Sequence, residues 1–472
     1  MRQDIKKTKI VCTIGPASER PETLKKLIAA GMNVARLNFS HDTHEKFAER
    51  IVNIRKLSRR HNCPVAILQD LGGPKIRIGA VKNGEIILEN GRLVALTGKA
   101  IVGDENVIPV AFKSLLKQIK KGDVLLLDDG TKKLRVVKKT EGGAVCRVVV
   151  GGRLKSFKGI NAPGVALAAR ALTAKDMKDA KFGAQMDVDF VALSFVRSAA
   201  DVSLLRRFLQ KNGSRAKIVA KIERPEAVSG IDAIIAAADA VMVARGDLAL
   251  ETPMEIIPAI QKEIIRKCNF AGKPVITATQ MLESMISQPI PTRAEITDVA
   301  NAILDGSDAV MLSGETAGGR FPVETVETMA KIAREAEKMM RLKYLPAELV
   351  TDETSQTISF GVVKVAKNLK AGAIVALTES GNTARRISAY KPNIPVLALT
   401  PNPATLRQLA LSWGVHPYLA PSRVADFNKM AEIAKETARR SNFAGKGNRI
   451  VISAGIPFGV KGTTNLLLVQ TV

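Results

Sequence analysis

The sequence of 472 residues has few cysteines, few aromatic residues and no long apolar runs. Its four cysteines are scattered and form no CxxC pair, which argues against both a disulfide framework and a zinc site. No stretch of eighteen apolar residues occurs, so no membrane-spanning helix is expected. The first residues contain no apolar signal core. Together these absences predict a cytoplasmic protein.

Aromatic residues make up 4% of the chain, whereas the formal net charge is +26. Such a charge is typical of a protein that binds a polyanion, and equally of an enzyme surface that meets anionic metabolites. One Trp and three Tyr offer little on which nucleic-acid bases can stack. The basic residues are also spread along the chain, so nucleic acid is not expected as the main partner.

Apolar runs alternate with helical patterns over most of the first 340 residues. Eight runs have the length and composition of buried parallel strands, and each is followed by a helical pattern. The runs are 9–15, 33–39, 64–70, 189–195, 217–223, 240–245, 274–279 and 308–313. This repeat predicts an α/β fold with a closed (β/α)8 TIM barrel.

Two stretches depart from this alternation. Between 75 and 169, short alternating runs separated by glycines predict an antiparallel β-barrel lid domain, inserted after the third strand. After residue 343, apolar runs that alternate with helices predict a smaller C-terminal α/β domain. The expected domains are the barrel (1–74 and 170–343), the lid (75–169) and the C-terminal domain (344–472).

The most informative pattern is a lysine with two carboxylates at predicted strand ends. Lys221 and Glu223 end one strand and Asp247 follows the next. In an extended chain the first two share a face and lie about 7 Å apart. Carboxylates from neighbouring strand ends can hold a divalent metal, and a lysine beside them can meet a phosphoryl group. The alternative is a salt bridge at a strand end.

Polar residues also follow the C-terminal ends of other predicted strands, which form the catalytic face of such a barrel. The full set is Arg36, Asn38, Ser40, Asp70, Lys221, Glu223, Asp247, Thr279 and Glu315. Because so many separate strands contribute a polar residue, an active site is favoured over an isolated salt bridge.

Five long motifs follow one another in a specific order, at 9–18, 31–41, 278–285, 291–295 and 311–316. In this order, and with the lid and C-terminal domain in the same places, the chain resembles the pyruvate kinase family from end to end. The resemblance implies phosphoryl transfer from phosphoenolpyruvate to ADP, giving pyruvate and ATP in the last step of glycolysis. It also implies Mg²⁺ (or Mn²⁺) as cofactor and a homotetramer.

The resemblance implies roles for residues at matching positions. Lys221 and Arg36 would bind the phosphoryl group in flight, and Thr279 would lie near the enolate carbon that takes up a proton. Glu223 and Asp247 would hold the metal. The expected substrate-binding residues are Arg36, Lys221, Gly246, Asp247 and Thr279, and the expected nucleotide-binding residues are Asn38, Ser40, His41, Arg77 and Lys158. For His41 the alternative is a helix cap.

One stretch departs from the family pattern. Where the family commonly has a threonine and a glutamate after the third strand, this chain has Leu71 and Lys75. The usual K⁺ site would draw on Asn38, Ser40 and Asp70, and the ammonium of Lys75 would be a tethered replacement for K⁺. The chain therefore resembles the K⁺-independent branch of the family. The alternative is that Lys75 is a surface lysine without this role.

A second anion site is predicted in the C-terminal domain, where a strand passes into a helix. Thr378, Ser380, Gly381 and Thr383 bring hydroxyls and free N–H groups to the start of that helix. In the family this region often binds a phosphorylated sugar or a nucleotide effector. The alternative is a capped helix with tight turns.

Two other functions stay open. A barrel lyase that acts on phosphoenolpyruvate or an enolate would not depend on ADP. An inactive relative would use its basic surface to bind a polyanion. The inserted lid and the pair of motifs at 221–223 and 245–247 argue against the lyase. A chemically competent residue at every matched catalytic position argues against the inactive relative, so the kinase is favoured over both.

Overall fold

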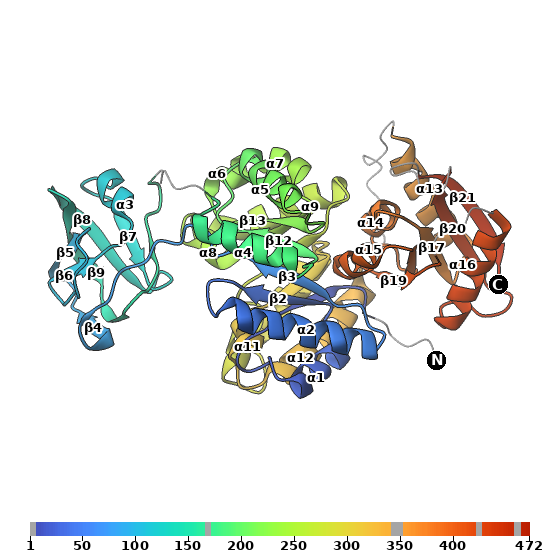
Figure 1. Ribbon diagram of the computed structural model, residues 1–472, viewed down its shortest axis with the longest axis horizontal. Coiled ribbons are helices and arrows are strands. Elements are labelled where there is room, and N and C mark those ends of the chain that lie inside the picture. Colours follow the sequence, from blue (N-terminus) through green and yellow to red (C-terminus); the bar gives the residue numbers. More distant parts are fainter. Residues whose placement is uncertain (1–5, 166–170, 341–352, 422–426, 457–463) are drawn as a thin grey trace.

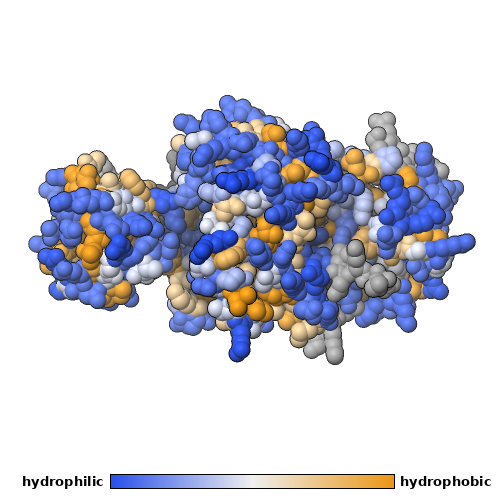
Figure 2. Space-filling model, turned by 90° about the horizontal axis from the view of Figure 1, so that it is seen from below, coloured by the Kyte–Doolittle hydropathy of each residue, from blue (hydrophilic) through white to orange (hydrophobic). Residues whose placement is uncertain are grey.

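The computed structural model describes residues 6–165, 171–340, 353–421, 427–456 and 464–472. A central barrel lies between a domain built mostly of sheet and a C-terminal α/β domain (Figure 1). In Figure 2 hydrophilic residues cover most of the face seen from below, and a narrow waist separates the lid from the barrel. The predicted domain boundaries at 169/170 and 343/344 lie outside the described residues.

Eight parallel strands close into the barrel in the order β1-β16-β15-β14-β13-β12-β3-β2. They are β1 (Lys9–Thr13), β2 (Val34–Asn38), β3 (Ala66–Asp70), β12 (Phe190–Leu193), β13 (Lys217–Ile222), β14 (Ala240–Ala244), β15 (Val275–Ala278) and β16 (Ala309–Leu312). Each coincides with one of the eight predicted runs. The runs read as continuously apolar because both faces are buried: Val11 and Val219 pack inside the barrel, whereas Ile10 and Ile218 pack under the helices.

Helices surround the barrel and begin where the sequence places caps or proline. Thr173 and Thr292 each form a capping box with the acidic residue three positions on. The elements are α1 (Pro21–Ala30), α2 (His44–Arg60), α4 (Ala174–Gln185), α5 (Ala199–Lys211), α6 (Pro225–Ser229), α7 (Ile231–Ala237), α8 (Arg245–Ala249), η2 (Met254–Ile256), α9 (Ile257–Phe270), η3 (Glu283–Ile286), α10 (Arg293–Leu304), α11 (Gly314–Ala317) and α12 (Pro322–Met339). No described helix has the length and apolar character needed to cross a bilayer.

The lid contains a six-stranded sheet in the order β11-β7-β8-β9-β5-β6 and a two-stranded sheet, β10-β4. Its elements are η1 (Lys82–Gly84), β4 (Glu85–Leu88), β5 (Leu93–Thr97), β6 (Val107–Pro109), α3 (Lys113–Gln118), β7 (Val124–Leu127), β8 (Lys132–Thr140), β9 (Gly143–Val150), β10 (Gly152–Lys155) and β11 (Ile160–Asn161). Isolated bridges from Arg77 to Gly159 and from Ile78 to Val110 link the two edges of the larger sheet. One pair, β5 with β6, is parallel, which the antiparallel prediction missed.

The C-terminal domain is a five-stranded sheet in the order β19-β18-β17-β20-β21, in which β21 alone runs antiparallel to its neighbour. Its elements are α13 (Thr354–Asn368), β17 (Ala373–Leu377), α14 (Asn382–Ala389), β18 (Val396–Thr400), α15 (Pro403–Gln408), η5 (Leu409–Leu411), β19 (Val415–Leu419), α16 (Phe427–Arg440), β20 (Arg449–Gly455) and β21 (Thr464–Thr471). Ala410 and Leu411 pack into the barrel's interior core and so close its floor. The C-terminal domain is thus anchored opposite the mouth.

Candidate active site

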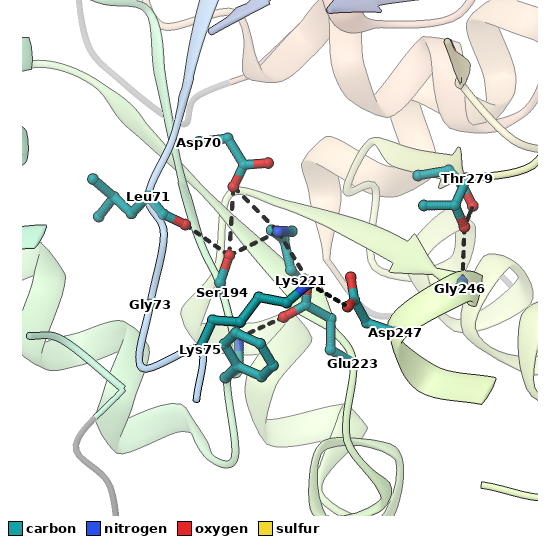
Figure 3. A network of polar contacts seen from close by, with 12 residues as sticks. Asp70, Leu71, Gly73, Lys75, Ser194, Lys221, Glu223, Gly246, Asp247 and Thr279 are labelled. Atoms are coloured by element: carbon teal, nitrogen blue, oxygen red, sulfur yellow. Dashed lines mark hydrogen bonds and ion pairs between the residues drawn. The ribbon is translucent and has the colours of Figure 1, made fainter. Parts of the chain in front are cut away.

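Lys221 lies near the end of β13 at the mouth of the barrel, with only 10% of its side chain exposed. Its Nζ lies 3.2 Å from Asp70 Oδ1 and 2.8 Å from Glu223 Oε1, and it donates to Ser194 Oγ at 2.7 Å (Figure 3). Burial favours the neutral amine, but the carboxylates of Asp70 and Glu223 outweigh it and raise the pKa of Lys221. The side chain is therefore a fixed cation at neutral pH.

Asp70 joins that lysine to a second cation, Arg36. Its Oδ2 accepts from Arg36 Nε at 2.7 Å and lies 2.6 Å from Arg36 Nη2. Burial favours the neutral acid, but the charges of Lys221 and Arg36 outweigh it and lower the pKa of Asp70. Arg36 Nη1 also donates to Thr13 Oγ1 at 2.9 Å, which fixes the guanidinium across two strand ends. Two oriented cations therefore lie side by side at the mouth.

Glu223 and Asp247 bring two carboxylates to the same region from β13 and α8. Glu223 is 1% exposed, and its Oε2 accepts from Phe195 N at 2.7 Å. Burial raises the pKa of Glu223, the charge on Lys221 opposes this, and the charge on Asp247 adds to the increase. Asp247 keeps 29% of its side chain exposed. A divalent cation between the two would relieve the strain of placing like charges together.

The carboxylates of Glu223 and Asp247 suit a metal that takes few ligands from the protein. No group of three or more His, Cys, Asp or Glu among the described residues could hold a metal by itself. Mg²⁺ commonly uses one or two carboxylates and completes its shell with waters and substrate oxygens. Glu223 and Asp247 therefore fit Mg²⁺ bound together with an oxygen-rich substrate.

Thr279 follows β15 and has a backbone φ of +72°, which is rare for a β-branched residue. Its Oγ1 accepts from Gly246 N at 2.8 Å, and its carbonyl accepts from Arg245 Nη2 at 2.8 Å. Arg245 is itself held by both oxygens of Asp298, at 2.7 and 2.8 Å. The surrounding contacts thus impose a strained backbone on Thr279, as is common at functional sites.

Lys75 links the lid to the barrel. Its Nζ lies 3.5 Å from Asp129 Oδ1, in a lid turn, and 3.9 Å from Asp247 Oδ1. The predicted cation region placed Lys75 with Asp70, but the structure pairs Asp70 with Arg36 and Lys221 and pairs Lys75 with the carboxylates across the mouth. The ammonium of Lys75 is therefore fixed beside Asp247.

The predicted nucleotide residues lie on both sides of the space between barrel and lid. On the barrel side, Ser40 N donates to Asn38 Oδ1 at 3.2 Å. His41 does not cap a helix, because α2 begins at His44 after Thr43. Burial, followed by the charge of Arg77, lowers the pKa of His41 and keeps it neutral at neutral pH.

On the lid side, Arg77 Nη1 donates to the carbonyl of Phe157 at 3.0 Å. Lys158 Nζ lies 2.9 Å from Asp128 Oδ1. Arg77 and Lys158 thus occupy adjacent segments, joined by the bridge between Arg77 and Gly159.

Three features of the site escaped the sequence prediction. Ser194, which accepts from Lys221, and Phe195, whose N–H donates to Glu223, follow β12, a strand whose polar end was visible in the sequence. Asp247 lies just past β14 as predicted, but it belongs to a short helix, α8, that was not expected. The contacts of Glu315 are the third feature: it is buried and accepts from two backbone N–H groups.

The predicted effector loop is closely hydrogen-bonded. Thr378 Oγ1 accepts from Gly381 N at 2.9 Å, and Gly381 has a φ of +84° before α14 begins. Thr383 Oγ1 lies 2.7 Å from Thr464 Oγ1, so these hydroxyls satisfy each other. Arg385 Nη2 donates to the carbonyl of Ser380 at 2.8 Å and brings a cation to the loop.

Comparisons with known proteins match nearly the whole chain. A family model described as pyruvate kinase, barrel domain, matches residues 5–326, and one described as pyruvate kinase, alpha/beta domain, matches residues 356–470. The chain is 44% identical over 473 residues to a pyruvate kinase of Clostridium acetobutylicum, covering 99% of this chain and 100% of the relative. It is 47% identical over 473 residues to one of Geobacillus stearothermophilus (99% and 80%) and 46% identical over 476 residues to one of Staphylococcus epidermidis (99% and 81%).

Proposed function

The chain belongs to the pyruvate kinase family, and on that premise we propose that its barrel mouth transfers the phosphoryl group of phosphoenolpyruvate to ADP, giving pyruvate and ATP. The observation that supports this best is the buried ammonium of Lys221, held between Asp70 and Glu223 beside Arg36. A phosphoryl group in flight spreads negative charge over its oxygens, so its transfer depends on positioning and on fixed cations.

Each side chain at the mouth has a role in this proposal. Lys221 and Arg36 bind oxygens of the phosphoryl group, and Thr279 lies beside the enolate carbon that takes up a proton. Glu223 and Asp247 would hold Mg²⁺ (or Mn²⁺), and the N–H of Gly246 is kept in place by Thr279. When bound, the metal supplies positive charge for the enolate and phosphoryl oxygens.

The nucleotide is proposed to bind between the barrel and the lid. Asn38, Ser40 and His41 would contact it from the barrel, and Arg77 and Lys158 would bind its phosphates from the lid. Closing the lid over these groups excludes water, which would otherwise compete with ADP for the phosphoryl group.

We further propose that the enzyme needs no K⁺, because the ammonium of Lys75 supplies the charge. Lys75→Glu is expected to lower kcat/KM about tenfold or more in K⁺-free buffer, a loss of about 1.4 kcal/mol of transition-state stabilisation. Added K⁺ should restore much of that loss, whereas the wild type should not respond. Lys82→Glu makes the same charge change at an exposed lid position and serves as control. If Lys75→Glu stays insensitive to K⁺, the tethered-charge proposal is wrong.

The loop of Thr378, Ser380, Gly381 and Thr383 is proposed to bind a phosphorylated effector, with the Arg385 guanidinium beside it. A sugar phosphate or AMP is expected to shift the phosphoenolpyruvate concentration at half-maximal rate. Thr378→Ala should abolish that shift without changing kcat. If none of these ligands causes a shift, the loop is only a tight turn.

The cellular setting is proposed from the family. The enzyme would act in the cytoplasm at the last step of glycolysis, and as a homotetramer, the assembly that the resemblance to the family implies. Light scattering at micromolar concentration measures the assembly directly.

The activity itself is tested by following pyruvate formation from phosphoenolpyruvate with Mg²⁺, with and without ADP. Pyruvate release that needs no ADP would indicate a lyase. The alternative function, binding of a polyanion, is supported by one observation. Arg135 and Arg147 lie directly opposite each other on β8 and β9, and a bound anion would reduce the repulsion between their like charges. Folded protein without turnover, but with salt-dependent retention on nucleic acid, would favour that alternative.

A further inference from the structure

Phe157 combines two unusual properties in a loop of the lid. Its φ is +62°, a left-handed conformation in which a bulky aromatic residue is an outlier. Its side chain is also 60% exposed, in a chain with few aromatic residues. An apolar ring that stays in water on a strained backbone does not stabilise the fold. A contact with a ligand would account for both properties.

Backbone outliers of this kind are otherwise found at the active site. In the described part of the chain, the aromatic or β-branched residues with positive φ are Phe157, Phe195 and Thr279. Phe195 donates its N–H to Glu223, and Thr279 accepts from Gly246. Two of the three therefore position groups at the barrel mouth. Strain persists where function requires it and where neighbouring contacts impose it.

Such contacts surround Phe157 on both sides. Its own N–H donates to Gly79 O at 3.2 Å, and its carbonyl accepts from Arg77 Nη1 at 3.0 Å. The next carbonyl, of Lys158, accepts from Ile78 N at 2.9 Å. The backbone path of this loop is thus fixed, and the ring is left facing solvent rather than packed in the lid core.

The backbone of Phe157 lies among cationic residues. Lys158 is its neighbour in sequence, and Arg77 is bonded to its carbonyl. One residue further on, a Cβ added to Gly159 would lie 3.1 Å from Lys75 Cε, and Lys75 Nζ reaches towards Asp247. The loop therefore borders the space between the lid and the metal carboxylates. An exposed apolar ring on a loop that also carries cations matches a ligand with both a planar base and phosphates.

We propose that Phe157 is the stacking platform for the base of the nucleotide, whose phosphates lie on Arg77 and Lys158. This inference rests on the proposed function, since it takes a nucleoside diphosphate as the ligand of the lid. Because every base has a π-face, stacking strengthens binding with little selectivity among bases. The strained backbone at Phe157 keeps the ring presented to the ligand.

The test uses paired substitutions in the full-length protein. Phe157→Ala is expected to raise KM for ADP about tenfold, with kcat and KM for phosphoenolpyruvate unchanged. Phe157→Tyr should restore the wild-type KM. Inhibition by pyrophosphate, which carries no base, should be equal in all variants. Phe270→Ala, at an exposed phenylalanine that ends α9 before the floor end of β15, is the matched control and should leave every constant unchanged.

A second variant separates binding from folding. Phe157→Gly removes the strain, so its melting temperature should be no lower than that of the alanine variant and about 1 °C higher, while its KM for ADP rises as in the alanine variant. A higher melting temperature with unchanged KM would overturn the proposal, since the ring would then have no role in binding.

Calorimetric titration with ADP tests the stacking role of Phe157 separately from the proposed phosphoryl transfer. If the wild type forms no pyruvate but binds ADP more tightly than Phe157→Ala, the stacking role stands and the proposed activity fails. If the wild type is active and all Phe157 variants bind ADP equally, the activity stands and the stacking role fails. If the wild type binds no ADP, both are wrong.

Discussion

Lys221→Met is expected to lower kcat about a thousandfold or more, because loss of a fixed cation at a phosphoryl group in flight costs that much in related chemistry. Methionine keeps most of the apolar stem, so the packing around β13 should survive. Arg36 remains and still pairs with Asp70, which leaves the variant a residual rate. The measurement is pyruvate formation at saturating phosphoenolpyruvate, ADP and Mg²⁺.

The matched control for that variant lies on the same strand. Lys217 begins β13 at the floor of the barrel and pairs with Asp239 at 3.4 Å, far from the mouth. Lys217→Met should therefore retain the wild-type kcat. A folded Lys221→Met enzyme with kcat within tenfold of the wild type would show that the phosphoryl group is not bound at this ammonium.

Stability should respond to the same substitution in a pH-dependent way. Without Lys221, buried Glu223 keeps its bond from Phe195 but loses its counter-charge, so its pKa in the folded state rises further above the unfolded value. A carboxyl group with a raised folded pKa favours the folded state when protonated, and that contribution is lost as pH rises through the folded pKa. The melting temperature of Lys221→Met should therefore fall, relative to the wild type, between acidic and neutral pH.

The barrel strands were predictable because each is a run of apolar residues buried on both faces, followed by a helical pattern. The same reasoning does not resolve β6 and β11 in the lid, because strands of three and two residues have too few side chains to show a period. It also missed β19, whose Pro417 is tolerated because this strand lies at the edge of its sheet.

The sequence predicted which residues form the site but not which of them contact one another. Strand ends and motifs indicated Lys221, Glu223 and Asp70, and the structure brings all three into contact. The partners of Lys75 were not predictable, because its contact with Asp129 depends on how the lid is placed against the barrel. Helix α8 was missed because five residues without a side-chain cap give no signal that distinguishes a helix from a turn.

Glu223→Gln is expected to weaken Mg²⁺ binding about a hundredfold or more, because loss of a direct ligand should exceed the loss known for groups that only support ligands. Glutamine has nearly the same shape and can still accept from Phe195 N, so the fold should be kept. Titration with Mn²⁺ followed by electron paramagnetic resonance measures the affinity without relying on turnover. High Mg²⁺ should recover part of the lost rate.

Glu226→Gln is the control for this change, because it alters the same residue type three positions later, at an exposed side chain paired with Arg224. Asp247→Asn tests the second carboxylate and should weaken the metal in the same direction. The double variant should lose specific metal binding, because the remaining carboxylate at the mouth, Asp70, is already paired with Lys221 and Arg36. Unchanged Mn²⁺ affinity in both single variants would place the metal elsewhere.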